Sequence, residues 1–310
     1  MPVFNTGQYL EEAIASVLGQ ASPFSDDMPS YELLLIDDQS TDPLTLEILD
    51  RHGRTSPHVR LMKNQRGKGA AGARNTGIVS ARGKWIGFLD SDDYWFPHAL
   101  TSRWRFIQAN PSVTWVAAHF YLLTAERGLQ RDPLSRRAPT LYRMIKSDYE
   151  RAIPSRLEKP VALFAKYCAV GIHTVLLRRD LVLAKGMFDE SLVRSEDYQL
   201  WFKCAVDQDL WLVPEDIAVY RLRPGSLTRR KEPVFFHEHR MLELLLSHAD
   251  FAPHADLLKA RMNMVLGDYC YYYRREKKYG EAIRWAAIWI RKAPTSFGAW
   301  KQLIAAGLRR

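Results

Sequence analysis

Three carboxylates follow directly on a short apolar stretch in the first third of the chain. The stretch covers residues 85–89 (Trp-Ile-Gly-Phe-Leu), and the acids after it are Asp90, Asp92 and Asp93. Strands buried on both faces read as continuous apolar runs, and ligands of open α/β sheets bind beyond the carboxyl ends of such strands. Grouped acids repel one another unless a cation neutralises them, and hard divalent cations bind carboxylate and phosphate oxygens together. The pattern predicts a site for a metal-bound, phosphate-bearing substrate; an acid-rich turn without a ligand is the alternative.

A second acid pair, Asp37 and Asp38, follows another apolar run over residues 31–36. If both runs are strands of one sheet, the two acid groups lie at the same ligand-binding edge. Asp37 and Ser40 can instead be turn residues that lead into the next helix.

Helix and strand patterns alternate to about residue 120. Asp42 followed by Pro43 predicts the cap and first turn of a helix that buries Leu46 and Leu49. Strands separated by helices form βαβ units, so we expect an α/β fold with a mostly parallel central sheet. The expected order is helix 9–18, strand 31–36, helix from 43, strand 59–62, helix 69–82 and a strand from 84.

Residues 65–75 form a glycine-rich segment, Gln-Arg-Gly-Lys-Gly-Ala-Ala-Gly-Ala-Arg-Asn. A glycine-rich loop that opens a helix can bind phosphate through its backbone N–H groups. This segment lacks both the Walker spacing and the dinucleotide-binding fingerprint. A flexible loop before a closely packed helix is therefore the alternative.

The composition excludes several classes of protein. The 310 residues are 47% apolar and 25% charged, which suits one large domain or two smaller ones. Cys168, Cys204 and Cys270 are widely spaced and include no Cys-x-x-Cys pair, which argues against a disulfide framework and a zinc site. No run approaches 18 apolar residues and no signal pattern opens the chain. We therefore expect a cytoplasmic protein, and a location at the inner face of the membrane is the alternative.

The net charge of +9 is compatible with an anionic small molecule, an anionic membrane surface or nucleic acid as partner. No nucleic-acid recognition motif is present, so we do not expect nucleic acid. Peripheral membrane association is left open. The basic residues gather in the segment 221–231, in the last third of the chain, and at Arg131, Arg136, Arg137, Lys146, Arg151 and Arg156.

Several motifs in order closely resemble the family 2 glycosyltransferases. They are Pro-Val-Phe-Asn at residues 2–5, the acid-tipped segment 31–42, Ala-Arg-Asn-Thr-Gly at 73–77 and the Asp90 cluster, and the resemblance covers about residues 1–225. It implies an inverting enzyme of GT-A fold that uses a nucleotide-sugar donor. The family normally has a full apolar strand before Pro-Val-Phe-Asn. We therefore expect a first strand that is cut short, or a start that is misassigned.

The resemblance implies a donor site built from both acid groups. Asp38 would accept a hydrogen bond from the nucleotide base, with the Phe4 ring stacked on it. An acid suits uracil, whose N3 is a donor, and this favours a UDP-sugar. Lys68 and Arg74 would lie near the diphosphate, and Asp90 would contact the ribose or the metal through water.

The resemblance also assigns the metal. Asp92 would ligate a Mg²⁺ or Mn²⁺ ion that neutralises the departing diphosphate. Arg223 stands where the family frequently has histidine; it cannot ligate a metal, but it can clamp phosphate oxygens. His173, in an expected strand over 173–177, is interpreted as a core or pocket-wall residue.

A second motif, Phe-Asp-Glu at residues 188–190 followed by Glu196 and Asp197, resembles the catalytic segment of the family. Inverting transfer needs a base that removes the acceptor hydroxyl proton, and the resemblance makes Asp197 that base and Glu196 a supporting acid. Asp189 and Glu190 are expected to shape the loop. Capping of the next helix is the alternative role for the acids at its start.

These features predict a GT-A glycosyltransferase domain over residues 1–231, followed by a helical extension over 232–310. Residues 1–120 would bind the donor and 121–231 the acceptor, a glycan or a lipid-linked glycan in cell-surface polysaccharide synthesis. Two other functions remain open. A nucleotidyltransferase of related fold would release pyrophosphate, and a non-catalytic protein would bind the sugar nucleotide or a membrane surface without turnover.

Overall fold

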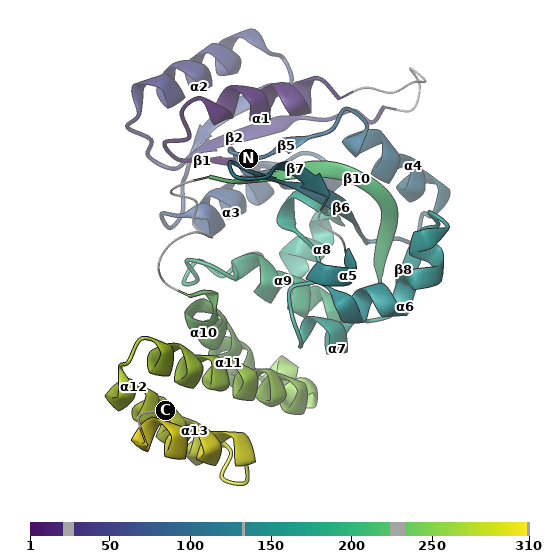
Figure 1. Ribbon diagram of the computed structural model, residues 1–310. Helices are drawn as coiled ribbons and strands as arrows, with labels where there is room; N and C mark the ends of the chain where they lie inside the picture. The colour runs from purple at the N-terminus through teal and green to yellow at the C-terminus, as the bar shows by residue number, and fades with distance from the viewer. Residues whose placement is uncertain (21–27, 132–133, 224–232, 309–310) are drawn as a thin grey trace. The chain divides into compact units, whose positions relative to one another are not determined.

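The computed structural model describes residues 1–20, 28–131, 134–223 and 233–308. The chain divides into two compact units, Met1–Arg229 and Arg230–Arg310 (Figure 1). The boundary predicted from the sequence, between residues 231 and 232, falls beside this division. Most of the basic segment 221–231 lies outside the described residues.

The first sheet carries the amino-terminal half of the site. It has three parallel strands in the order β1-β2-β3. Helices α1 and α2 lie on one face of this sheet and α3 on the other (Figure 1). The elements are β1 (Pro2–Val3), α1 (Tyr9–Leu18), β2 (Leu33–Asp37), α2 (Pro43–Thr55), β3 (Val59–Lys63) and α3 (Ala70–Ser80).

The second sheet is mixed. Its strands follow the order β4-β9-β6-β10-β5, with β7 on β6 and β8 on β10, and only β6 and β10 pair in parallel. The parallel arrangement expected for the whole sheet therefore holds for β1–β3 and for this one pair. The strands are β4 (Trp85–Gly87), β5 (Tyr94–Trp95), β6 (Trp115–Thr124), β7 (Gly128–Arg131), β8 (Ser155–Leu157), β9 (Leu176–Arg178) and β10 (Leu210–Leu222).

Helices and short turns complete the first unit. Its core includes Trp115 and Trp201, which stack at 5.9 Å between ring centroids and are fully buried. The remaining helices are α4 (Ala99–Ala109), α5 (Leu134–Arg137), α6 (Pro139–Glu150), α7 (Val161–Phe164), the 3₁₀ turn η2 (Ile172–Thr174), α8 (Arg179–Ala184) and α9 (Glu196–Ala205).

β1 has two residues and pairs with β2. A cavity of about 470 Å³ lies where β2 faces β4, lined mainly by apolar side chains that include Leu34, Ile86 and Leu176. The two sheets of the unit thus border a space that side chains leave unfilled.

Helix α2 begins as predicted but turns a different face inward. The Asp42 carboxylate accepts a hydrogen bond from the Thr45 N–H at 2.8 Å, which caps the helix at Pro43. Thr45, Ile48 and Leu49 are buried, whereas Leu46 is 42% exposed. The expected burial of Leu46 is wrong, because the inward stripe follows positions 45, 48 and 49 and position 46 lies one residue off it.

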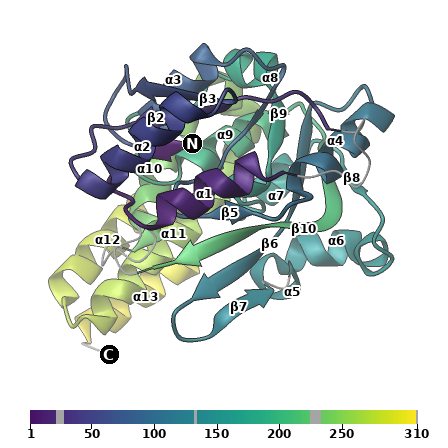
Figure 2. The same cartoon turned by 90° about the horizontal axis from the view of Figure 1, so that it is seen from above.

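The second unit is helical throughout its described part. Besides the 3₁₀ turn η4 (Ala249–His254), it contains α10 (Val234–Ser247), α11 (Ala255–Arg275), α12 (Tyr279–Lys292) and α13 (Phe297–Gly307) (Figure 2). α12 buries Ala282, Ala286 and Trp289, and the Trp289 indole N–H donates to Asn263 Oδ1 at 2.9 Å. None of the described helices is both long and apolar enough to cross a membrane.

Candidate active site

The first motif joins the two acid-bearing turns. Asn5, with a positive φ of 47°, accepts hydrogen bonds on its Oδ1 from the backbone N–H groups of Thr41 at 2.7 Å and Asp42 at 2.9 Å. The next residue, Thr6, shares a hydrogen bond of 2.6 Å with Ser91 inside the Asp90 cluster. The two acid groups predicted to share one edge are therefore tied to a single turn.

One end of the site is built around Asp38. This carboxylate is 5% exposed and accepts hydrogen bonds from Asn64 Nδ2 at 2.6 Å and from the Gly69 N–H at 2.8 Å. Phe4 is 47% exposed, and Lys68 Nζ lies 4.9 Å from its ring centroid. The structure thus brings an exposed aromatic face and a cation together, and it holds Asp38 with neutral donors.

Asn64 was missed by the sequence reasoning. It follows β3 directly, and its main-chain N–H donates to the Asp37 carbonyl at 2.8 Å. The first polar residue after a third parallel strand has the same positional signal as the acids after the other strands.

The glycine-rich segment forms a tight loop before α3. A Cβ on Gly72 would lie 1.8 Å from the Gly67 carbonyl oxygen, so these two glycines make a backbone contact that no side chain allows. Gly69 has a φ of 124°, a conformation that favours glycine. The loop is therefore closed by its own backbone rather than left as a flexible linker.

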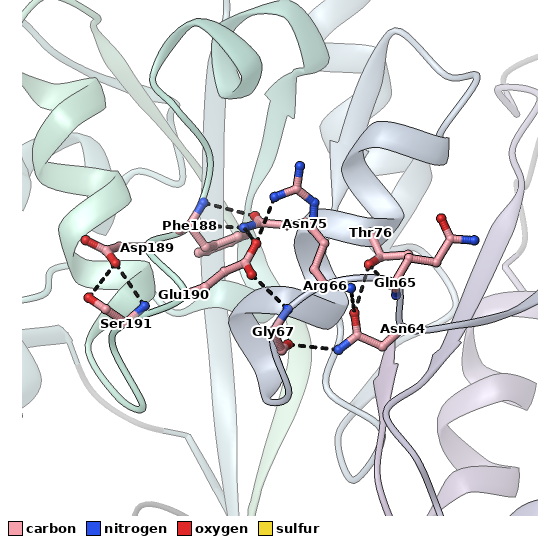
Figure 3. Close-up of polar contacts among 10 residues, drawn as sticks. All are labelled: Asn64, Gln65, Arg66, Gly67, Asn75, Thr76, Phe188, Asp189, Glu190 and Ser191. Atoms are coloured by element: carbon pink, nitrogen blue, oxygen red, sulfur yellow. Dashed lines mark hydrogen bonds and ion pairs between the residues drawn. The ribbon is translucent and has the colours of Figure 1, made fainter.

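Glu190 holds this loop from the other side (Figure 3). Its carboxylate accepts hydrogen bonds from the Gly67 N–H, from Arg66 Nη1 at 2.9 Å and from Asn75 Nδ2 at 2.8 Å. Asn75 also exchanges two hydrogen bonds with the Phe188 backbone. The Phe-Asp-Glu motif and the glycine-rich segment thus form one structure, which agrees with the expected loop-shaping role of Glu190.

Arg74 is the central cation at the other end of the site. It is 6% exposed, and its Nη2 lies 2.7 Å from Asp90 Oδ1 while its Nη1 lies 2.6 Å from Glu196 Oε1. Burial raises the pKa of a carboxyl group, but the Arg74 guanidinium outweighs it and lowers the pKa of Asp90. Arg74 therefore connects the donor motif to the helix that carries Glu196.

The remaining acids of the Asp90 cluster have the opposite behaviour. Asp92 Oδ2 accepts a hydrogen bond from Arg223 Nε at 2.8 Å, yet burial and the charge of Asp90 raise the pKa of Asp92. Asp93 accepts a hydrogen bond from the Arg221 N–H at 2.8 Å. Burial and the charges of Asp90 and Asp92 raise the pKa of Asp93 well above the usual range. Burial is the largest cause of both raised pKa values and repulsion between the acids comes next; Arg223 beside Asp92 and Arg221 beside Asp93 do not offset them.

A divalent cation fits this charge. Carboxylate oxygens are the donors that Mg²⁺ and Mn²⁺ prefer, and such ions are often held by one or two carboxylates plus substrate phosphates. Within the described ranges, no group of three or more histidine, cysteine, aspartate or glutamate residues is arranged to hold a metal by itself. Asp92 would therefore need donor oxygens from a ligand to complete the coordination.

Asp197 lies in the first turn of α9, after Ser195, which has a left-handed φ of 66°. Burial and the charge of Glu196 raise the pKa of Asp197 from 3.8 to about 7, against the opposing charge of Arg74. A carboxyl group with this pKa can accept a proton at neutral pH. Helix capping by its side chain is not what the described contacts show, because Asp197 accepts only from the next N–H, that of Tyr198.

His173 lies in η2 and not in the expected strand, since β9 begins at Leu176. It is 3% exposed, stacks on Tyr220 and has its Nδ1 3.7 Å from Asp93 Oδ2. The interpretation as a core or pocket-wall histidine agrees with this burial. The strand prediction is wrong because the turn, closed by the Thr174 hydroxyl on the Gly171 carbonyl at 2.7 Å, interrupts the apolar run.

Tyr9 is a further residue that the sequence reasoning missed. The guanidinium groups of Arg221 and Arg223 lie 4.8 Å and 5.2 Å from its ring centroid, and Arg221 also pairs with Glu12. One aromatic ring therefore contacts both Arg221 and Arg223. No signal in the sequence links residues so far apart.

Four of the ten basic side chains in the region 121–170 are paired with acids. Arg131 contacts Asp216 at 2.9 Å and Arg156 contacts Asp209 at 2.6 Å. Weaker pairs join Lys146 to Glu150 and Arg151 to Asp148. Part of the positive charge of this region is therefore balanced within the unit.

The family model described as "Glycosyl transferase family 2" matches residues 1–174, more than half of the chain. The chain belongs to this family. It is therefore a glycosyltransferase, and family membership decides against both the nucleotidyltransferase and the non-catalytic alternative. Among curated relatives, the chain is 28% identical over 233 residues to the Escherichia coli glucosyltransferase WfgD, which is described as "UDP-Glc:alpha-D-GlcNAc-diphosphoundecaprenol beta-1,3-glucosyltransferase". That match covers 74% of this chain and 79% of WfgD.

Solved structures confirm the fold. Residues 1–349 of S. aureus TarS, crystallised with UDP-GlcNAc, match 99% of this chain and 86% of that one with a TM-score of 0.64 and 16% identity. The mannosyltransferase PcManGT from Pyrobaculum calidifontis, solved with GDP-Man and Mn²⁺, matches 99% of this chain and 78% of that one with a TM-score of 0.56 and 16% identity. The predicted α/β fold of GT-A type with helices after it is confirmed.

Proposed function

We propose that this enzyme transfers a sugar from a UDP-sugar to a hydroxyl group of a glycan or lipid-linked glycan, with inversion, during cell-surface polysaccharide synthesis. The observation that carries the proposal is the Arg74 bridge, which joins Asp90 of the donor motif to Glu196 beside Asp197. Chemistry and donor binding thereby share one buried cation. The relative WfgD, whose name specifies a UDP-sugar donor and a diphosphate-linked lipid acceptor, supports the choice of substrates.

The base end selects the nucleotide in this proposal. Asn64 and Gly69 each donate to one Asp38 oxygen, and each oxygen keeps a second lone pair for the N3–H of uracil. Phe4 offers an exposed ring for stacking, and Lys68 beside it offers a positive charge toward the phosphates. A nucleotide base without an N–H group facing Asp38 would leave the remaining lone pairs of this buried carboxylate without a hydrogen bond.

The diphosphate lies next to Asp92 and Arg223 in this proposal. A Mg²⁺ or Mn²⁺ ion held by Asp92 would act as a Lewis acid for the departing diphosphate. Arg223 already donates to Asp92, so its guanidinium stands where phosphate oxygens would arrive and can clamp them bidentately. Tyr9 keeps the guanidinium in place.

Asp197 is the base of the proposed mechanism. Its carboxylate removes the proton of the acceptor hydroxyl while that oxygen attacks the anomeric carbon opposite the leaving diphosphate. A pKa of about 7 balances the fraction of deprotonated base against its basicity. Glu196, bound to Arg74, contributes by raising that pKa and by fixing the start of α9.

The proposal is tested by product analysis with a panel of UDP-, GDP- and dTDP-sugars and acceptors that carry a diphosphate-linked lipid or a soluble glycan. We expect UDP release, a new glycosidic bond and inverted anomeric configuration by nuclear magnetic resonance. Equal use of GDP-sugars would overturn the role of Asp38. Retention of configuration would overturn the role of Asp197.

A further inference from the structure

Helix α13 carries its large apolar side chains outward. The exposed fractions are 82% for Phe297, 47% for Trp300, 60% for Ile304 and 61% for Leu308. These residues recur at intervals of three, four and four, so they form one continuous stripe along the helix, here called the α13 stripe. A contiguous exposed apolar surface of this kind marks an interaction site.

The stripe is not needed to hold α13 in its own unit. The opposite face of the helix includes Ala299 and Ala306, which are fully buried, and α13 packs on α12 and α11. Trp300 donates its indole N–H to the Pro294 carbonyl at 2.9 Å. The polar atom of the stripe therefore has a partner already, and its ring can enter an apolar phase without a lost hydrogen bond.

The unit that carries this stripe is basic. The unit Arg230–Arg310 contains 15 lysines and arginines against 8 aspartates and glutamates, so it holds seven of the nine net positive charges of the chain. No acid occurs after Glu281. The basic residues after it are Arg284, Arg291, Lys292, Lys301, Arg309 and Arg310.

We propose that the α13 stripe docks on the surface of an anionic phospholipid bilayer. A helix that presents Trp, Phe and Leu on one face of a basic segment lies in the membrane interface, with its apolar face among the acyl chains and its cations on the headgroups. A second copy of the chain is a poorer occupant, because it would bring two acid-free basic segments together. With 11 residues, α13 lies on a bilayer and does not span it.

This inference goes beyond the proposed reaction, since it needs neither donor nor acceptor. The test uses the full chain in vesicle flotation, with vesicles of phosphatidylcholine alone and of phosphatidylcholine mixed with phosphatidylglycerol. We expect binding to the mixed vesicles only, and weaker binding as salt rises. The double variant Phe297→Ser/Ile304→Ser should bind at least about 10²-fold more weakly, because two large side chains lose their apolar burial.

The control is Tyr271→Ser on α11, which replaces a side chain that is 60% exposed in the same unit but outside the stripe. It should bind as wild type. Equal binding to both kinds of vesicle, unchanged binding of the double variant, or an equal loss in the control would overturn the proposal.

Two further measurements separate the other occupants. A concentration-dependent dimer in sedimentation that the double variant abolishes would assign the stripe to a second copy and overturn the proposal. A melting temperature several degrees lower in the double variant would show that the stripe is covered within the chain, with the same consequence. Transfer to a water-soluble acceptor should be unchanged in the double variant, so failure of docking and failure of the proposed reaction are distinguished.

Discussion

The two ends of the active site hold their carboxylates in different ways. At the end proposed to bind the nucleotide base, Asp38 is held by neutral donors, the Asn64 amide and a backbone N–H. At the other end, Asp90 and Glu196 share the buried guanidinium of Arg74. Neutral donors fix the position of an acid without adding a charge, whereas the buried guanidinium of Arg74 also lowers the pKa of Asp90.

In the proposed mechanism, this difference separates nucleotide recognition from the chemical step. A change at the neutral end removes one hydrogen bond, which is worth a small free energy. A change at the charged end alters the protonation and charge on which the reaction depends. The comparison therefore predicts large effects on transfer at the charged end and small effects on donor binding at the neutral end.

The largest effect is expected from Asp197→Asn. Transfer should fall by about 10²- to 10⁴-fold, because the amide cannot remove the acceptor proton, while UDP-sugar affinity stays within about a few-fold of wild type. Calorimetry for donor affinity and product formation on the same preparation measure the two quantities.

The matched control is Asp189→Asn, in the same motif, where the carboxylate accepts from the Ser191 N–H at 2.9 Å and the Ser191 hydroxyl at 2.7 Å. It should retain far more transfer. Near wild-type transfer by Asp197→Asn would contradict its role as the base, because the amide cannot take up the acceptor proton.

Asp92→Asn is expected to have the next largest effect. Loss of the carboxylate charge should lower metal-dependent transfer by about 10²-fold and weaken UDP binding in the presence of Mn²⁺, because the ion would lose its protein ligand. Binding of UDP in chelator should change much less. Full activity of the wild type in chelator would contradict the metal assignment, whatever the variant does.

How far the sequence predicts this site depends on the distance along the chain. Asp38 and Asp90 stand directly after apolar runs, so local pattern identified both acids. The single sheet expected for their strands is wrong, because β2 and β4 belong to different sheets. The Arg74–Glu196 pair joins positions 122 residues apart, and only the resemblance placed these two residues in one site. The Asn64 contact to Asp38 was missed because an amide after a short strand has no distinctive composition.

The fold shows the same limit. The order of helices and strands up to β4 follows from period and cap residues, as with Asp42 and Pro43. The inward face of α2 and the antiparallel partners of β4 and β6 depend on neighbours distant in sequence, which local pattern does not specify. Leu46 and His173 were misplaced for this reason.

A smaller effect is expected from pH. With a pKa of about 7, the fraction of deprotonated Asp197 rises about tenfold between pH 6 and pH 8, so kcat/KM should rise by about the same factor. The residual activity of Asp197→Asn should lack this rise. The same shift has the opposite sign for stability: the folded protein holds this proton more tightly than the unfolded chain, so the free energy of unfolding contributed by Asp197 falls as pH rises from about 4 to 7. A kcat/KM of the wild type that does not change between pH 6 and pH 8 would contradict the assignment of Asp197 as the base.

The smallest effect is expected at the neutral end, from Asp38→Asn. The amide can keep an acceptor oxygen for the Gly69 N–H but turns a donor toward the uracil N3–H, so UDP affinity should fall by about three- to tenfold and discrimination against GDP should narrow.

Asn64→Ala is the matched variant, because it removes one partner of Asp38 and leaves the carboxylate in place. It should weaken UDP binding without narrowing discrimination, as the acid still accepts from the base. Competition of UDP, GDP and dTDP against a labelled UDP-sugar measures both quantities. If the two variants narrow discrimination equally, the position of the loop after β3, and not the charge of Asp38, selects the base.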